Sequence, residues 1–243
     1  MPSVKMPPLI AGRFVARDNR FRVRVELPGG ERTAYLPNTG RLGELLVRGR
    51  SCWVAPVSTR TRKTHYDLKL VRHAGTLVSV DAHLPNALVA EALAEGWLEP
   101  FEQYGDFKRE VRLGESRLDF RLDGAANVCW MEVKSVTLVE GGVARFPDAP
   151  TVRGARHVRE LAQAVAGGAR AAVVFVVQRD DACCFEPHDA ADPEFAAALR
   201  EAAMHGVAVC AWTCQVGTES IWVKRQIPIH LDHGGGTDAS DSG

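Results

Sequence analysis

A run of eight residues, MEVKSVTL at positions 131–138, places an acid and a base two positions apart among apolar residues. This composition is typical of a strand, in which residues i and i+2 point to the same face of the sheet. Glu132 and Lys134 are therefore expected to lie side by side, with Met131 and Val133 on the opposite face. A carboxylate beside an amine, on a strand otherwise made of core residues, is a candidate catalytic pair.

A second carboxylate, Asp119, lies in the preceding RLDF motif, and a hairpin through DGAAN would bring it close to Glu132 and Lys134. Two close carboxylates repel each other, which favours a bound divalent cation, and hard oxygen ligands select Mg²⁺ or Mn²⁺. The cation would orient a water and stabilise charge on a scissile phosphate, while the lysine would hold the nucleophile or the developing oxyanion. The alternative is a structural ion pair, worth about 0.2–1 kcal/mol if exposed.

Four further residues are candidates for the same cleft, and each has a simpler interpretation. Glu110 would be a supplementary metal ligand or a solvated strand charge. Arg153 and His157, four positions apart on one helix face, would bind phosphate or belong to a salt-bridged surface with Glu160. Asp148 of the FPDA motif would line the cleft or bond only to its own loop backbone.

The formal net charge of zero conceals two halves of opposite charge. Residues 1–75 contain 15 Lys and Arg against 5 Asp and Glu, and the remaining residues contain 15 against 25, so the halves carry +10 and −10. The asymmetry indicates a nucleic acid or another polyanion as partner of the first half, unless the basic surface is merely solvated. The cationic residues expected to contact phosphate are Arg20, Arg22, Arg24, Arg41, Arg60, Arg62 and Lys63.

The elements that would position these residues form two groups, of which the first is all-β. FRVRVEL alternates charged and apolar residues, the segment 28–30 supplies a turn, and ERTAY returns as a hairpin partner. The alternation places Phe21 on the apolar face, and so in the core. About five short strands suit a small closed barrel such as an OB-fold, expected over residues 1–80.

Beyond residue 80 the pattern becomes a helix ending at Gly96, three strands, and then alternating helices and buried strands, which predicts an α/β domain over residues 81–232. One of these helices, from 151 to 165, would carry a polar face separate from its apolar stripe. That face consists of Arg153, Arg156, His157 and Glu160. The polar, glycine-rich and acidic stretch 233–243 is expected to be disordered.

Several classes of protein do not fit the sequence. No apolar run reaches the roughly 18 residues of a membrane span, and the start lacks the apolar core of a secretory signal. The six cysteines are too sparse for a disulfide scaffold, which indicates a reduced, cytoplasmic protein. Cys183, Cys184, Cys210 and Cys214 fit the ligand spacing of no zinc module.

The motifs PNTG, RLDF, MEVKSVTL, FPDAPTVRG and RHVREL, together with Asn86, resemble in content and order those of the sugar fermentation stimulation protein A (SfsA) family. The resemblance implies an OB-fold-like first domain and a second domain similar to PD-(D/E)XK nucleases. It assigns Asp119 and Glu132 to the metal and makes Lys134 the catalytic lysine. It also implies sequence-nonspecific DNA binding and a role in regulating maltose use.

Three hypotheses about function follow, and the sequence leaves them open. The first is a DNA-binding protein with a divalent-metal site of the nuclease type. The second is an active Mg²⁺- or Mn²⁺-dependent endonuclease acting on DNA or RNA. The third is a regulator whose nuclease-like domain serves only for binding.

Overall fold

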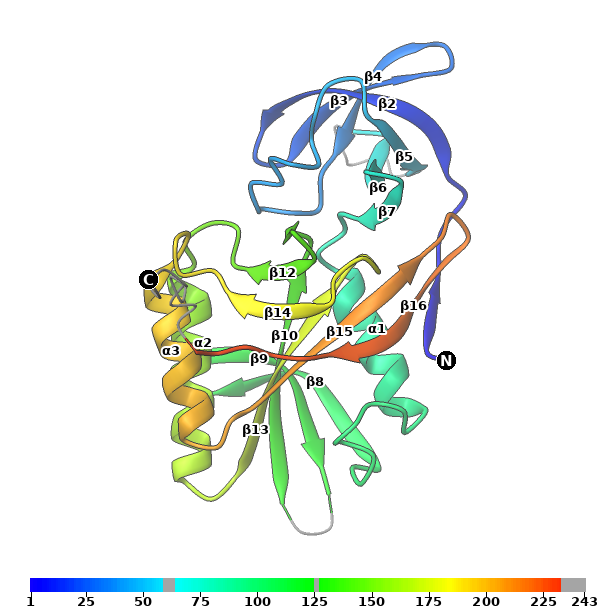
Figure 1. The fold of residues 1–243 in the computed structure, drawn as a ribbon. Coiled ribbons are helices and arrows are strands. Elements are labelled where there is room, and N and C mark those ends of the chain that lie inside the picture. Colours follow the sequence, from blue (N-terminus) through cyan, green and yellow to red (C-terminus); the bar gives the residue numbers. More distant parts are fainter. Residues whose placement is uncertain (59–63, 125–126, 233–243) are drawn as a thin grey trace, which may run out of the picture.

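The computed structural model describes residues 1–58, 64–124 and 127–232, which form a small barrel and a larger α/β domain (Figure 1). Three of the predicted phosphate contacts, Arg60, Arg62 and Lys63, lie outside the described residues, as does the stretch 233–243. In the part of the chain that the structure describes, no helix is long and apolar enough to cross a membrane.

The small domain is built on a six-stranded sheet in the order β4-β3-β2-β5-β6-β7, in which a parallel pairing between β4 and β6 closes five of the strands into a barrel. Its strands are β2 (Ile10–Asn19), β3 (Arg22–Leu27), β4 (Gly30–Tyr35), β5 (Ser51–Pro56), β6 (Tyr66–His73) and β7 (Thr76–Ser79). The predicted β3–β4 hairpin is present, and Gly29 and Gly30 turn it with φ of 96° and 104°, which glycine adopts readily. Val23 and Val25 point from β3 into the barrel core.

The prediction that Phe21 belongs to this core is wrong. The residue lies in the turn before β3, where the side chain of Asn19 accepts a hydrogen bond from the Phe21 N–H. This local turn leaves the Phe21 ring 44% exposed, stacked on Tyr35 with a centroid distance of 6.1 Å. Strand alternation fails as a guide here because it begins only at Arg22.

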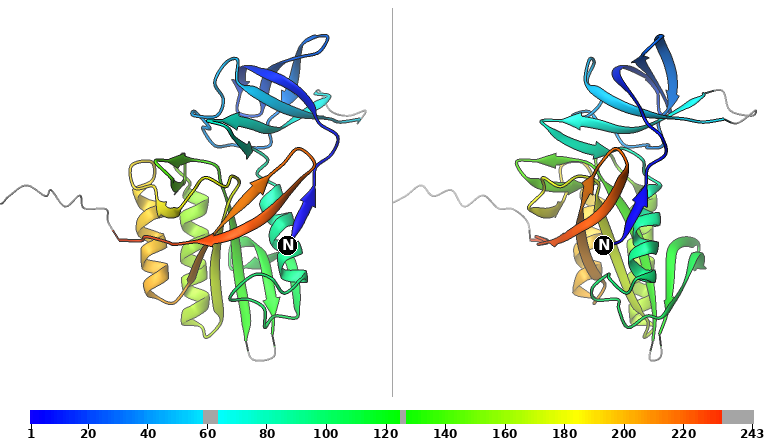
Figure 2. Two further views of the ribbon diagram at one scale, coloured as in Figure 1. Left: turned by 45° about the vertical axis from the view of Figure 1, so that its right-hand side comes forward. Right: turned by 90° about the vertical axis from the view of Figure 1, so that its right-hand side faces the viewer.

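The larger domain contains a seven-stranded sheet in the order β1-β16-β15-β13-β10-β9-β8, in which β10, β13 and β15 are parallel. Its strands are β1 (Ser3–Lys5), β8 (Asp106–Leu113), β9 (Ser116–Asp123), β10 (Val128–Val136), β13 (Arg170–Val177), β15 (Ala208–Val216) and β16 (Ser220–Ile227). Figure 2 shows β1 beside β16, although the sequence assigned residues 1–80 to the first domain. The start of the chain therefore completes the sheet of the second domain.

Helices cover both faces of this sheet (Figures 1 and 2). One face packs on α1 (Leu84–Ala94), and the other packs on α2 (Val152–Ala166) and α3 (Pro193–Met204). The starts of α2 and α3 are capped, since Thr151 and Asp192 accept hydrogen bonds from the N–H groups of Gly154 and Phe195. The predicted polar face of α2 is wrong at His157, which is buried beside Val158.

A small sheet of β11 (Val139–Glu140), β12 (Val143–Phe146) and β14 (Cys184–Pro187) lies at the side of the larger domain that faces the barrel (Figure 1). The loop after β12 carries Asp148, whose Oδ2 accepts a hydrogen bond of 3.1 Å from the Leu42 N–H of the barrel. Gly40 passes so close that a methyl group there would lie 2.5 Å from Asp148 Oδ2. The segment from the PNTG motif to Leu42 therefore contacts the loop of the larger domain that carries Asp148.

Candidate active site

The β9–β10 hairpin brings Asp119 to Glu132, as predicted from the two motifs. The backbone pairing of β9 with β10 ends at the residue pair Phe120–Met131. Beyond this pair, the side-chain carboxylate of Asp119 takes the place of a backbone carbonyl as hydrogen-bond acceptor. Its Oδ2 accepts a hydrogen bond of 2.8 Å from the Val133 N–H. Its Oδ1 accepts one of 2.6 Å from the Asn86 side chain on α1. Both oxygens of Asp119 are therefore held in fixed directions.

Glu132 is buried, and its two oxygens have different surroundings. Oε1 accepts hydrogen bonds of 2.6 Å from Lys134 Nζ and of 2.6 Å from His157 Nδ1. Oε2 is also buried but has no hydrogen-bond partner among the described residues. A buried carboxylate oxygen without a partner is costly, and it points to an ion or water that occupies the site in the working protein.

His157 is a link in a chain of hydrogen bonds. The guanidinium of Arg153 donates from Nε to His157 Nε2 at 3.1 Å, and arginine has no acceptor atom. Nε2 must therefore be the acceptor, so the ring carries its proton on Nδ1 and donates it to Glu132. Both ring nitrogens of His157 are therefore engaged with Arg153 and Glu132 in this structure, and neither faces the position expected for a phosphate.

The two carboxylates have pKa values displaced in opposite directions. Burial, followed by the negative charge of Glu132, raises the pKa of Asp119 to about 6. Burial also acts to raise the pKa of Glu132, but the Lys134 ammonium and the hydrogen bond from His157 outweigh it and lower that pKa to about 2. Neighbouring carboxyl groups whose pKa values are displaced in opposite directions are typical of functional sites.

These residues fit a divalent cation. Asp119 and Glu132 supply hard oxygen donors of the type that Mg²⁺ and Mn²⁺ prefer, and Glu132 Oε2 is free to bind. A cation would also offset the burial and the charge of Glu132, which together raise the pKa of Asp119. The donor set and its electrostatics both favour a metal at this position.

The third predicted ligand, Glu110, is not assembled with the other two. It is exposed on β8, where its carboxylate lies 3.1 Å from the Arg117 guanidinium. In the described residues, the carboxylates of Glu110, Asp119 and Glu132 do not form a group with ligand atoms within 4.8 Å of one another. The structure agrees with the alternative interpretation of Glu110 as a solvated, ion-paired charge.

A cavity of about 260 Å³ lies between the domains and reaches the site. Lys134 and Ser135 line it from β10, while Arg20 and Gly40 line it from the barrel. The predicted cleft residue Asp148 lies in its wall, followed by the residues at the start of α2. Two cationic side chains and a helix N-terminus make this cavity suited to a phosphate group.

The remaining basic residues of the barrel are placed unequally. Arg41 is exposed, as is Arg20 at the rim of the cavity. Arg22 and Arg24 instead lie 3.2 and 2.9 Å from the carboxylate of Asp18. Arg24 also lies 2.9 Å from that of Glu31. The predicted phosphate-binding face on β3 is therefore partly neutralised by the protein's own acids.

The residue pattern predicted no role for two residues that support the site. Asn86 entered only through the resemblance, yet it binds Asp119 directly. Arg17 donates to the backbone carbonyls of Arg20, Gly40 and Arg41, and so braces the loop beside the cavity. A single arginine on an exposed strand gives no sequence signal for such a contact.

Comparison with known proteins decides the family. A profile described as "Sugar fermentation stimulation protein RE domain" matches residues 83–220, and one described as "SfsA N-terminal OB domain" matches residues 15–80. The chain belongs to the SfsA family. The predicted fold, an OB barrel followed by a restriction-endonuclease-like α/β domain, is confirmed.

Similar proteins extend over nearly the whole chain. The "Sugar fermentation stimulation protein homolog" of Moorella thermoacetica is 49% identical, covering 92% of this chain and 97% of its own length. That of Desulforamulus reducens is 43% identical, covering 94% and 95%. The solved structure of Pyrococcus furiosus SfsA in complex with Ca²⁺ superposes with a TM-score of 0.86 at 31% identity, covering 95% of this chain and 99% of that one.

Proposed function

We propose that this SfsA-family protein binds nucleic acid, in the first place DNA, across the cavity between its domains and hydrolyses phosphodiester bonds with Mg²⁺ or Mn²⁺. The observation that carries the proposal is the buried, unpartnered Oε2 of Glu132 beside Asp119. A relative solved with Ca²⁺ supports a divalent-cation site in the family. The basic character of residues 1–75 supports a polyanionic substrate.

A bound Mg²⁺ or Mn²⁺ would supply a Lewis acid for the phosphoryl oxygens and lower the pKa of a bound water. Asn86 and the Val133 N–H hold Asp119 in the direction that this requires, and His157 does the same for Glu132. Such fixed ligands need no reorganisation during the reaction.

Lys134 has a double role in this scheme. Its ammonium group lies 2.6 Å from Glu132 Oε1 while the residue lines the cavity. An ammonium group has three N–H donors, so one can keep Glu132 ionised while another donates to a phosphate oxygen or an attacking water. Arg20 would draw the nucleic-acid backbone toward this position from the opposite wall.

A second candidate is a DNA-binding protein that does not cleave, including a regulator of sugar (maltose) metabolism. The close Lys134–Glu132 ion pair favours it, because a lysine committed to that carboxylate is less available for catalysis. The names of the curated relatives refer to sugar fermentation, which is the only support for that regulatory role.

Supercoiled plasmid and single-stranded DNA and RNA, incubated with Mg²⁺, Mn²⁺ or a chelator, separate the two candidates. The hydrolase predicts metal-dependent nicking that is lost in Asp119→Asn/Glu132→Gln and kept in Asp123→Asn, a matched change four residues along β9. Binding of these substrates without cleavage under every condition would favour the DNA-binding protein and refute the hydrolase.

A further inference from the structure

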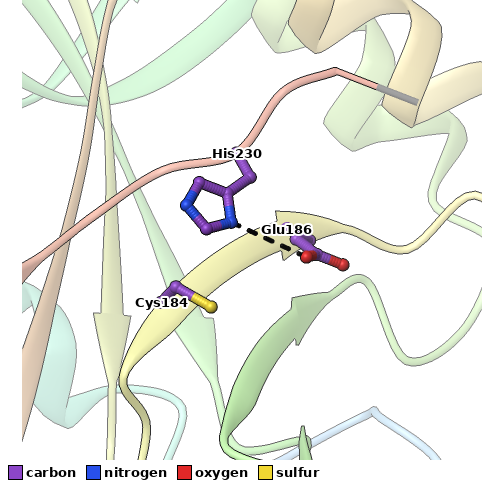
Figure 3. A group of neighbouring side chains, drawn as sticks. All are labelled: Cys184, Glu186 and His230. Carbon is purple, nitrogen blue, oxygen red and sulfur yellow. Dashed lines mark ion pairs between the residues drawn. The ribbon is translucent and has the colours of Figure 1, made fainter. Parts of the chain in front are cut away.

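A second group of metal-binding side chains lies on the small sheet, away from β10. The thiol of Cys184, the carboxylate of Glu186 and the ring of His230 place one ligand atom each within 4.8 Å of one another (Figure 3). Cys184 and Glu186 are two positions apart on β14, so both project from the same face of the strand. His230 comes from the segment that follows β16.

The backbone fixes this arrangement. The Phe185 N–H donates to the Pro228 carbonyl, and the His230 N–H donates to the Phe185 carbonyl, both at 2.9 Å. The Phe185 ring is buried and stacks on Phe175 with a centroid distance of 4.1 Å. The segment carrying His230 is thus tied to the residue between Cys184 and Glu186, which sets the backbone positions of all three residues, while the side chain of His230 is 57% exposed.

The spacing leaves room for an ion between the three side chains. His230 Nδ1 and Glu186 Oε1 are 3.8 Å apart, which is too long for a hydrogen bond (Figure 3, dashed line). In a tetrahedral zinc site, bonds of about 2.0–2.3 Å hold neighbouring ligand atoms roughly 3.3–3.8 Å apart. Only small side-chain movements are needed to reach that geometry.

We propose that Cys184, Glu186 and His230 form a zinc site, separate from the carboxylate site on β9 and β10 and independent of the proposed hydrolysis. A thiolate, an imidazole and a carboxylate are the donors that zinc takes, whereas Mg²⁺ prefers oxygen alone. On binding, the zinc–sulfur bond replaces the thiol S–H bond and the proton passes to solvent. Three protein ligands leave the fourth position to water.

The surroundings of Glu186 suit this role. Arg145 lies 3.3 Å from Oε2, which leaves Oε1 directed toward His230. Glu186 also lines a surface cavity of about 510 Å³, through which a cation can enter. A bound zinc would fasten the segment after β16 to β14, and its effect would be on stability.

Zinc titration of the full-length protein tests this site, using a chromophoric competitor and excess Mg²⁺ to occupy the carboxylate site. We expect one zinc ion per chain, and a loss of affinity in His230→Ala of more than about 100-fold, beyond the effect of losing an outer-shell partner. His65→Ala, a change of an exposed histidine on the barrel, should leave zinc binding unchanged.

Cobalt provides a second readout that does not depend on affinity. The Co²⁺-loaded protein should show a thiolate-to-cobalt charge-transfer band that disappears in Cys184→Ser. Equal zinc binding by His230→Ala and His65→Ala would overturn the proposal, as would a cobalt spectrum without the thiolate band. Either result would leave only a weak His230–Glu186 ion pair on the surface.

Discussion

Glu132 inside the larger domain and Arg24 on the barrel each lie between two side chains that can carry the opposite charge, and the two groups differ in burial. Glu132 lies between Lys134 and His157, and its side chain is 6% exposed. Arg24 lies between Asp18 and Glu31, and its side chain is 40% exposed. Water screens the second group but not the first. The hydrogen bonds from Arg24 to Asp18 and Glu31 only raise the pKa of a group that is already charged, whereas in the interior the pKa values of two neighbouring carboxyl groups are displaced in opposite directions.

The two groups should differ most in the free energy of unfolding that is lost when the positively charged side chain of each is replaced. Lys134→Met leaves Glu132 buried without its ammonium partner, and we expect a loss of about 3 kcal/mol in the free energy of unfolding. Arg24→Met, the matched change on the barrel, should lower the free energy of unfolding much less, because water screens its exposed ion pairs. Urea unfolding at neutral pH measures both. Similar losses in the two variants would show that burial does not separate these groups.

The pH dependence of stability tests the interior group in another way. The pKa of Asp119 is about 6 in the folded protein against an ordinary 3.8, so the folded state holds this proton more tightly. The resulting stability is complete below about pH 4 and is lost as the pH rises through about 6.

Between about pH 4 and pH 6 and above, the free energy of unfolding of the cation-free wild type should fall by up to about 3 kcal/mol. Asp119→Asn, which has no carboxyl group to titrate at this position, should not show this loss. The pKa of Glu132, lowered to about 2, acts in the opposite sense, and its contribution disappears only as the pH falls from about 4.5 toward 2. Urea midpoints at several pH values, in the presence of chelator, measure the difference. Parallel curves for the wild type and Asp119→Asn would contradict the raised pKa of Asp119.

Replacing His157 should lower the affinity for the metal ion more than it lowers the stability of the fold. His157→Phe removes the donor that orients Glu132, so we expect Mn²⁺ affinity to fall by about 10- to 100-fold. His157→Gln, which can still donate to Glu132, should recover part of that loss. Calorimetric titration with Mn²⁺ measures both variants. Unchanged affinity in His157→Phe would confine the histidine to packing.

The smallest expected effects concern the exposed arginines. Arg20→Glu, at the rim of the cavity, should weaken DNA binding several-fold and lower the salt slope of log K by about 1. Arg24→Glu should change the DNA affinity and the salt slope less, because Asp18 and Glu31 already offset the charge of Arg24. Fluorescence anisotropy over a range of salt concentrations compares them. A larger effect of Arg24→Glu would place the DNA on β3.

Local patterns predicted the strands that carry the catalytic candidates. Alternation along 131–138 and the motif RLDF predicted the hairpin that joins Asp119 to Glu132, and the change of pattern beyond residue 80 predicted the α/β domain. The same local patterns failed where the chain meets a distant partner. His157 is buried where it donates a hydrogen bond to Glu132, and β1 pairs with β16 of the larger domain instead of joining the barrel.

The proposed zinc site of Cys184, Glu186 and His230 shows more clearly that local sequence patterns do not predict contacts between distant parts of the chain. The cysteines fit no zinc module because only Cys184 among them takes part, and its partner His230 arrives through a backbone contact with Phe185. Ligands that are brought together by tertiary packing do not show the regular spacing by which a zinc module is recognised in a sequence. Glu110 illustrates the converse, since its place on the preceding strand suggested a ligand that the structure pairs with Arg117.

Manganese binding at the β9–β10 site is the measurement that tests the central claim most directly. In a His230→Ala background, which removes the zinc ligand, calorimetry and electron paramagnetic resonance should detect one Mn²⁺ per chain. Glu132→Gln should abolish this binding, and Asp123→Asn should retain it, with plasmid nicking following the same order. Equal Mn²⁺ binding by Glu132→Gln and Asp123→Asn would show that the buried Oε2 of Glu132 does not hold the cation.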